Sequence, residues 1–114
     1  GATWIRIMEV KSNMTCSFMM NMICYANQDA SIIVGYVVNY DNKVQICNFK
    51  QLIGKAGEVY NPNLKYKKDG NTIIVWAKSS AINNKASCIN LLHGNASFPM
   101  IIETPPEDAI QPTW

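Results

Sequence analysis

The chain has 114 residues, of which 48% are hydrophobic and 16% are charged, and its formal net charge is +2. This length and composition predict one globular domain and exclude intrinsic disorder. The small net charge argues against a nucleic-acid partner, and no apolar run reaches the length of about 18 residues that predicts membrane insertion. The N-terminal residues lack the basic region and apolar core of a signal peptide. A start at Gly1 rather than Met suggests a processed chain or a fragment of a longer protein.

Alternation of apolar and other residues predicts strands from the start of the chain. The first covers residues 3–10 and places Trp4, Arg6 and Met8 on one side, and Ile5 and Ile7 on the other. The second extends from residue 14 to about residue 26. Every even position from Cys16 to Cys24 is apolar, which is the two-residue period of a strand and not of a helix.

Turn residues separate the later predicted strands. A third strand covers residues 30–40, with Ile33, Gly35 and Val37 on one face, and Asp41-Asn42 predicts a tight hairpin into a fourth strand. Further strands are predicted at residues 64–67, 72–78, 86–92 and 98–103, the last two separated by His93-Gly94-Asn95.

This succession of short strands predicts an all-β fold, an antiparallel and jelly-roll-like β-sandwich of about eight strands. From residue 104 three prolines exclude a central strand. We therefore predict a sandwich domain over residues 1–103 and an extended Pro-rich tail over residues 104–114.

The four cysteines predict free thiols rather than a disulfide framework. Cys16 and Cys24 lie on one predicted strand, roughly 26 Å apart at ~3.3 Å per residue, and a disulfide spans only about 7 Å between Cα atoms. The spacing does not exclude a cross-strand disulfide between either of these residues and Cys47 or Cys88. Buried free thiols are expected in a protein that folds in a reducing cytosol.

Residues with catalytic or metal-binding chemistry are scattered. His93 is the only histidine, the carboxylates are spread singly along the chain, and no CxxC pair is present. We therefore expect no enzyme activity, no metal and no cofactor. Lys65, Lys67 and Lys68 are interpreted as a solvated strand end, with contact to phosphate or an acidic glycan as the alternative.

A second apolar face predicts self-association. Residues on the side opposite the Cys16 face supply an expected oligomer interface: Met19, Ile23, Tyr25, Ile33 and Val37. A monomeric sandwich should be polar there, and large apolar patches mark association.

The order of segments resembles the distal domains of bacteriophage tail fibres and tail spikes. The opening Thr3-Trp4-Ile5-Arg6-Ile7 is similar to their W-x-[KR]-I start, and Phe18 and Gly35 match a phenylalanine strand and a central glycine. Ile74-Val75-Trp76-Ala77-Lys78 follows the Asp69-Gly70-Asn71 turn, and Ser87 to Leu92 closes the pattern. The resemblance covers residues 2–98.

The resemblance implies a homotrimeric tip domain on the virion, assembled in the host cytoplasm, that binds a bacterial surface saccharide or protein. The predicted function is non-enzymatic receptor binding. Expected ligand-binding residues are aromatic, amide and imidazole side chains near turns: Tyr60, Asn61, Asn63, Tyr66 and His93. The alternatives are a carbohydrate-binding module of a secreted bacterial glycosidase and a ligand-free trimerisation or capping domain of the virion.

Overall fold

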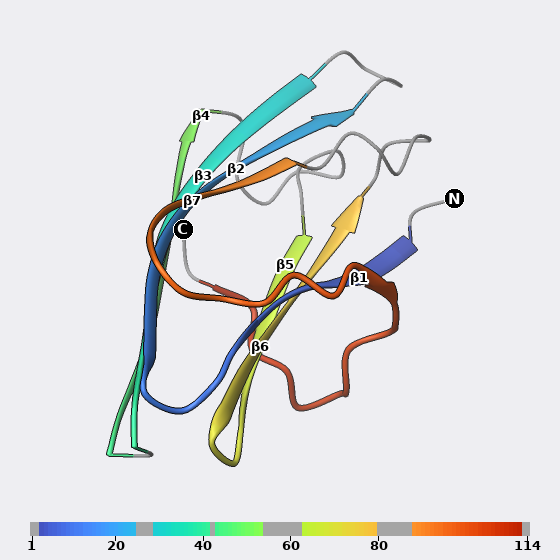
Figure 1. Cartoon of the computed structure of the whole chain (residues 1–114). Coiled ribbons are helices and arrows are strands. Elements are labelled where there is room, and N and C mark those ends of the chain that lie inside the picture. The colour runs from blue at the N-terminus through green and yellow to red at the C-terminus, as the bar shows by residue number, and fades with distance from the viewer. Residues whose placement is uncertain (1–2, 25–28, 42, 54–62, 80–87, 113–114) are drawn as a thin grey trace.

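The structure is a computed structural model that describes residues 3–24, 29–41, 43–53, 63–79 and 88–112. This part of the chain contains eight strands and no helix, in two antiparallel four-stranded sheets (Figure 1). The strands are β1 (Thr3–Val10), β2 (Met14–Cys24), β3 (Asp29–Tyr40), β4 (Val44–Ile53), β5 (Asn63–Asp69), β6 (Thr72–Ser79), β7 (Cys88–Gly94) and β8 (Ile101–Ile102). The predicted all-β sandwich is confirmed.

The two sheets have different connectivity. One sheet has the order β5-β6-β1-β8 and is called the β1 sheet below, and the other has the order β4-β3-β2-β7 and is called the β2 sheet. Strands β2, β3 and β4 follow one another as a meander, and β5 and β6 form a hairpin. In both sheets an early strand pairs with a late one, β1 with β8 and β2 with β7.

The core lies between the inner faces of the two sheets. Many of its fully buried side chains follow the two-residue period of a strand, among them Phe18, Met20, Ile33, Val37, Leu64, Ile73 and Val75. The Phe49 ring lies 5.8 Å from the Phe18 ring and 5.6 Å from the Tyr66 ring, so aromatic contacts join the two sheets. Burial of each such side chain contributes about 1.5–3 kcal/mol to the free energy of folding.

The register between β2 and β3 corrects the predicted oligomer interface. Ile33 lies opposite Met20, and Val37 lies opposite Cys16. Residues directly opposite each other in a sheet share a face, so Ile33 and Val37 enter the core, where each is 0% exposed. Their assignment to an oligomer interface is wrong, because they serve the core of their own sandwich.

The other residues expected at that interface have different positions. Met19 does lie on the outer face of the β2 sheet, half-buried and opposite Val34. Tyr25 and the side chain of Ile23 lie outside the described residues.

A β-bulge changes the expected faces of β1. The register shifts between Arg6 and Met8, so Met8 pairs with the core residue Val75. A bulge inserts one extra residue and reverses the alternation that follows it. Met8 therefore lies with Ile5 inside the core, and not on the same side of the strand as Trp4, as the alternation predicted.

The last two strands also differ from their predicted bounds. His93 and Gly94 belong to β7 rather than to a turn, and β8 contains only Ile101–Ile102. Pro99 has no N–H for the ladder, and Met100 has a φ of 53°. These two residues interrupt the strand predicted over residues 98–103.

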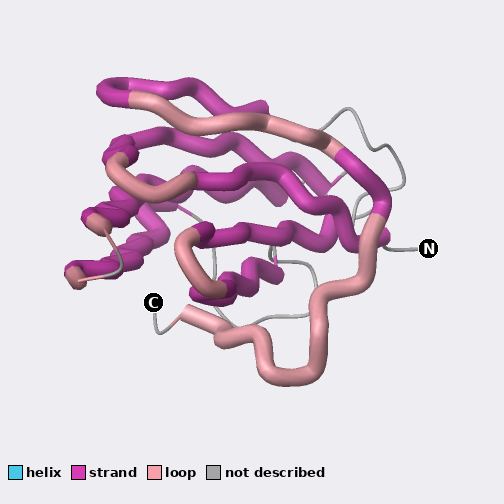
Figure 2. Tube along the Cα trace, turned by 60° about the horizontal axis from the view of Figure 1, so that its bottom comes forward, coloured by secondary structure: helices cyan, strands magenta, loops and turns pink. Residues whose placement is uncertain are grey.

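Residues 103–112, called the C-terminal strap, cross the outer face of the β1 sheet (Figure 2). At one edge the Glu103 N–H donates to the Trp4 carbonyl at 3.1 Å. At the other edge Ile110 and Tyr66 exchange two backbone hydrogen bonds of 2.8 and 2.9 Å. The strap thus packs on the sheet and pairs with the outer edge of β5.

One carboxylate anchors the start of the strap. Arg6 donates to both oxygens of Glu103, Nε at 2.6 Å and Nη2 at 2.9 Å, and Trp76 Nε1 donates to Oε2 at 2.8 Å. Arg6 Nη1 also donates to Glu9 at 2.7 Å. Hydrogen bonds from Arg6 and then Trp76 hold the pKa of Glu103 below its usual range, and the bonds to Glu103 and Glu9 raise the pKa of Arg6.

The lowered Glu103 pKa makes stability depend on acid pH. A carboxyl with a depressed folded-state pKa stabilises the fold above its unfolded value of about 4.3, and this contribution is lost as the pH falls through the folded-state pKa. At neutral pH, Glu103→Gln should lower the free energy of unfolding by about 1 kcal/mol, because the ion pair is partly exposed.

Urea unfolding at about pH 7 and about pH 3 measures this dependence. The difference between the wild type and Glu103→Gln should shrink at the lower pH, and the exposed Glu107→Gln serves as the control. Equal differences at both pH values would show that the Glu103 carboxylate does not fasten the strap.

Candidate functional site

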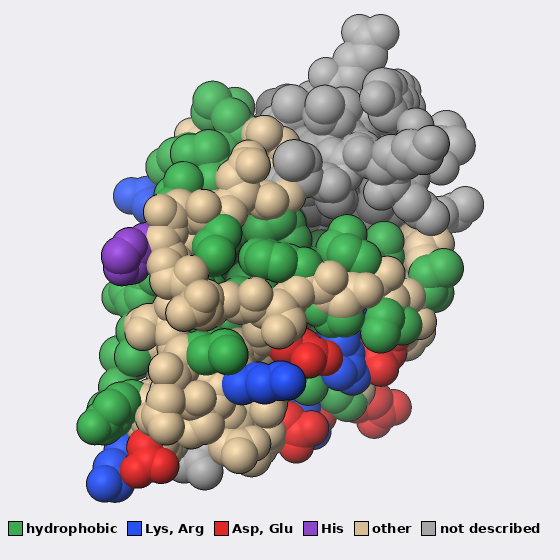
Figure 3. Space-filling model, in the orientation of Figure 1, with side chains coloured by type: hydrophobic (Ala, Val, Ile, Leu, Met, Phe, Trp, Pro, Cys, Tyr) green, Lys and Arg blue, Asp and Glu red, His purple; other side chains and the backbone are tan. Residues whose placement is uncertain are grey.

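The outer face of the β2 sheet carries an unusual number of exposed apolar side chains. They come from three strands: Tyr36, Tyr40, Val44, Ile46, Ile53 and Leu92. In Figure 3 hydrophobic side chains follow the left margin of the molecule, where Figure 1 shows this sheet nearly edge-on. The exposed face of an antiparallel sheet is normally polar, and a large apolar patch marks an association surface.

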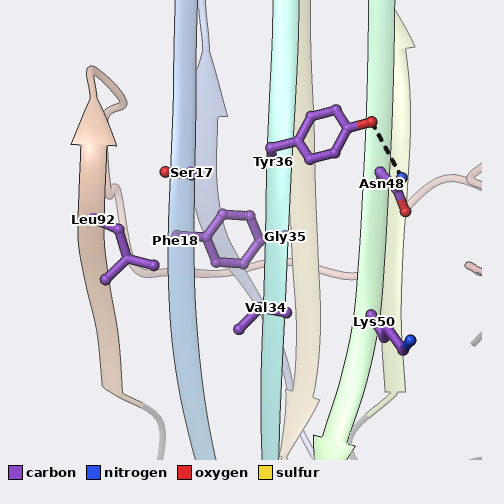
Figure 4. Close-up of a pocket in the computed structure, with 8 residues that line it drawn as sticks. All are labelled: Ser17, Phe18, Val34, Gly35, Tyr36, Asn48, Lys50 and Leu92. Atoms are coloured by element: carbon purple, nitrogen blue, oxygen red, sulfur yellow. Dashed lines mark hydrogen bonds between the residues drawn. The ribbon is translucent and has the colours of Figure 1, made fainter.

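A hollow of about 290 Å³ lies near the middle of this face. All four strands of the sheet line it: Ser17, Phe18, Val34, Gly35, Tyr36, Asn48, Lys50 and Leu92 (Figure 4). Tyr36 and Asn48 are opposite each other on β3 and β4, and Asn48 Nδ2 donates to the Tyr36 hydroxyl at 3.2 Å. This hydrogen bond orients a 43% exposed aromatic ring beside an amide.

Gly35 shapes the sheet beneath the hollow. A Cβ at this position would lie 2.8 Å from Phe18 Cζ and 2.9 Å from the Asn48 carbonyl oxygen. Only glycine allows the Phe18 ring to pack so closely against β3. The neighbouring residues on β3, Val34 and Tyr36, point outward and form walls of the hollow (Figure 4).

The chemistry of the hollow suits recognition. Tyr36 supplies an aromatic ring, Asn48 an amide, Ser17 a hydroxyl and Lys50 an ammonium group. The amide and hydroxyl both donate and accept hydrogen bonds, as sugar hydroxyls require of their partners. The ring and Leu92 supply apolar area for a sugar face or an apolar side chain of a receptor.

The thiols that the structure describes are poorly suited to nucleophilic chemistry. Cys16 and Cys47 are both free. Burial raises the pKa of the Cys16 thiol and raises that of Cys47 to about 11. Both are therefore protonated at neutral pH, and the thiolate is the reactive form. The sequence also allowed cross-strand disulfides that involve Cys24 or Cys88, but the side chains of these two residues lie outside the described residues.

The ligand-binding residues expected from the sequence do not converge. Tyr66 points inward from β5 and packs against Phe49, and burial raises the pKa of its hydroxyl. His93 is exposed on β7, at one edge of the β2 sheet, whereas Phe49 lies on β4 at the opposite edge and Tyr66 packs against it from β5 of the β1 sheet. Tyr60, Asn61 and the side chain of Asn63 lie outside the described residues.

Sequence reasoning missed the residues of the hollow because it searched the turns. Asn48 and Lys50 are two residues apart on a strand and therefore share a face. Two polar residues with this spacing beside an apolar strand indicate an exposed face. That signal could have drawn attention to Tyr36, which lies opposite Asn48.

Within the described ranges, no group of three or more His, Cys, Asp or Glu side chains could hold a metal ion. The same ranges contain no helix long and apolar enough to cross a membrane. Comparisons with protein-family models, with curated proteins and with solved structures gave no match.

Proposed function

We propose that the protein is a non-enzymatic receptor-binding domain that attaches a bacteriophage tail fibre or tail spike to a bacterial surface. The main observation that supports a binding role is the hollow at Tyr36, Asn48 and Lys50 on an exposed apolar sheet face. The order of sequence segments, beginning with Thr3 to Ile7, supports the tail-fibre context through its resemblance to fibre tips.

The favoured receptor is a surface saccharide. Ligand pockets usually enclose about 300–1,000 Å³. The hollow, at about 290 Å³, lies just below this range and suits one terminal sugar unit rather than an extended chain. The Tyr36 ring stacks on the sugar face, while Asn48 and Lys50 bond its hydroxyls. A protein receptor would place one apolar side chain in the same hollow.

Part of the proposal is that the domain acts as a homotrimer. Exposed Tyr40, Val44 and Ile46 lie toward the β3–β4 turn and do not line the hollow, and they would pack against neighbouring copies. Three hollows then act together, so a weak affinity per site suffices. Light scattering should give three times the chain mass of 12.8 kDa. A stable monomer at micromolar concentration would contradict the trimer.

Cell binding tests the assignment of the hollow. Tyr36→Ala should weaken adhesion of the labelled protein to a sensitive bacterial strain at least about tenfold, because the stacking surface is lost. Asn48→Ala should weaken it similarly. Phe98→Ala is the matched control, since Phe98 is 39% exposed against 43% for Tyr36 and lies beside the β1 sheet.

The same experiment separates the alternatives. If a folded, trimeric Tyr36→Ala variant adhered as well as the wild type, the hollow would not be the receptor site. A trimer that binds no cell would favour the ligand-free capping domain, to which the exposed apolar face also points. A monomer that binds saccharide through Tyr36 would favour the carbohydrate-binding module.

A further inference from the structure

A second cluster of chemically distinctive residues lies on the outer face of the β1 sheet, on the opposite side of the sandwich from the hollow. Trp4 on β1 lies opposite Lys78 on β6, and Lys65 reaches the same ring from β5. The Nζ atoms of Lys65 and Lys78 are 5.4 and 5.8 Å from the Trp4 ring centroid. The half-buried Trp4 indole thus makes cation–π contacts with two ammonium groups.

The described residues provide no carboxylate partner for the two lysines of this cluster. Arg6 pairs with Glu9 and Glu103, and Lys67 pairs with Asp108 at 3.2 Å. By contrast, no carboxylate of the described residues lies within 4.0 Å of the Lys65 or Lys78 ammonium group. Each cation–π contact is worth only about 0.5–1 kcal/mol at an exposed site, and two like charges near one ring repel each other.

We propose that Trp4, Lys65 and Lys78 bind an anionic sugar, either a uronic acid or a sugar phosphate. The carboxylate or phosphate bridges the two ammonium groups, and the C–H face of the sugar packs on the indole edge and ring. A charge-assisted hydrogen bond to each lysine replaces the weaker cation–π contact. This site goes beyond the proposed function, because it lies on the other sheet and does not use the hollow.

The surroundings favour a single anionic group over a polyanion. The same sheet face carries Glu9 and Glu103 beside Trp76, and Asp108 on the strap. These carboxylates repel an extended chain of negative charges. The net charge of +2 likewise provides little long-range attraction for nucleic acid.

Titration followed by NMR tests the proposal, with the Trp4 indole N–H as the reporter. The probes are a glucuronate-bearing disaccharide, glucose phosphate, an uncharged disaccharide and inorganic phosphate. We expect saturable shifts of the Trp4 signal with at least one charged sugar, and the stronger of the two identifies the source of the anion. Affinity should fall as ionic strength rises from about 0.05 to about 0.5 M.

Variants separate this site from its neighbours. Lys65→Gln combined with Lys78→Gln should weaken binding of the charged sugar at least about tenfold. Lys67→Gln is the matched control on the same face, and Tyr36→Ala should also leave the Trp4 response unchanged, so the two sites can fail independently. Equal binding of the uncharged disaccharide, equal binding of inorganic phosphate alone, no saturable response, or unchanged binding by the double variant would overturn the proposal.

Discussion

Gly94→Ala is expected to abolish stable folding of the chain. Gly94 has a φ of 84°, and a Cβ there would lie 1.9 Å from the backbone oxygen of Thr15. That oxygen also accepts the Asn95 N–H at 3.0 Å, so it is held in place. The methyl group can fit only if β7 moves away from β2. We expect a loss of more than about 4 kcal/mol, a large part of the total of about 5–15 kcal/mol for a domain.

Gly70→Ala is the matched control for this substitution. Gly70 also has a positive φ, 61°, but nothing lies within 4 Å of the position that a methyl group would take there. Alanine at this position meets only the left-handed backbone penalty of about 1–2 kcal/mol. Thermal unfolding followed by circular dichroism compares the two variants. Similar melting temperatures for both would show that β7 does not approach β2 as closely as the structure has it.

Asn39→Leu is expected to have the second largest effect on stability. Asn39 is 1% exposed, and its Nδ2 donates to the carbonyls of Val10 at 2.9 Å and Asn71 at 2.8 Å. Its Oδ1 accepts from Gln45 at 3.1 Å. One amide therefore joins β1, the β5–β6 turn and β4 to β3. Leucine has a similar size but donates no hydrogen bond, and it leaves the Val10 carbonyl buried without this partner.

The expected cost is about 2–4 kcal/mol, because one buried and two partly buried hydrogen bonds are lost. Asn90→Leu, at an exposed position of β7, should change the free energy of unfolding by less than about 0.5 kcal/mol. Asn39→Asp sharpens the comparison, since it keeps the shape and replaces the donor with an acceptor. Denaturant unfolding of all three variants measures the effect. If Asn39→Asp left the free energy of unfolding unchanged, the two hydrogen bonds that Asn39 donates would not stabilise the fold.

Strand periodicity explains why the architecture could be predicted from the sequence. The alternation around Cys16, Phe18 and Met20 reflects one buried face, and all three residues lie in the core. Turn chemistry at Gly70 likewise predicted the β5–β6 hairpin, where a positive φ is needed. These signals are local, so a single sequence contains them.

Pairing between strands is not local, and here prediction failed. Ile33 and Val37 belong to a strand with apolar residues on both faces, so periodicity alone could not decide which face enters the core. Only the register with Met20 and Cys16 decides it. The bulge near Met8 shows in the sequence only as two consecutive apolar residues, Ile7 and Met8, after which the alternation resumes in the opposite phase at Glu9 and Val10.

The candidate site was missed for a related reason. Tyr36, Asn48 and Leu92 come from three strands and meet only after the β2 sheet has formed. Trp4 and Lys78 are also far apart in sequence, and only the β1–β6 register places them side by side. Residues near turns, such as His93, are easier to single out, yet the structure places His93 and Tyr66 at different edges of the sandwich.

The central claim is that the outer face of the β2 sheet recognises the receptor. Mapping which residues contact a bound receptor tests this claim most directly. The measurement is an NMR titration with an uncharged surface oligosaccharide from a bacterium to which the protein adheres. Signals of Val34, Tyr36, Asn48 and Leu92 should shift, while those of Trp4 and Lys78 stay in place. Shifts confined to the β1 sheet, or no shifts with an oligosaccharide that blocks adhesion, would contradict the assignment of the receptor site to this face.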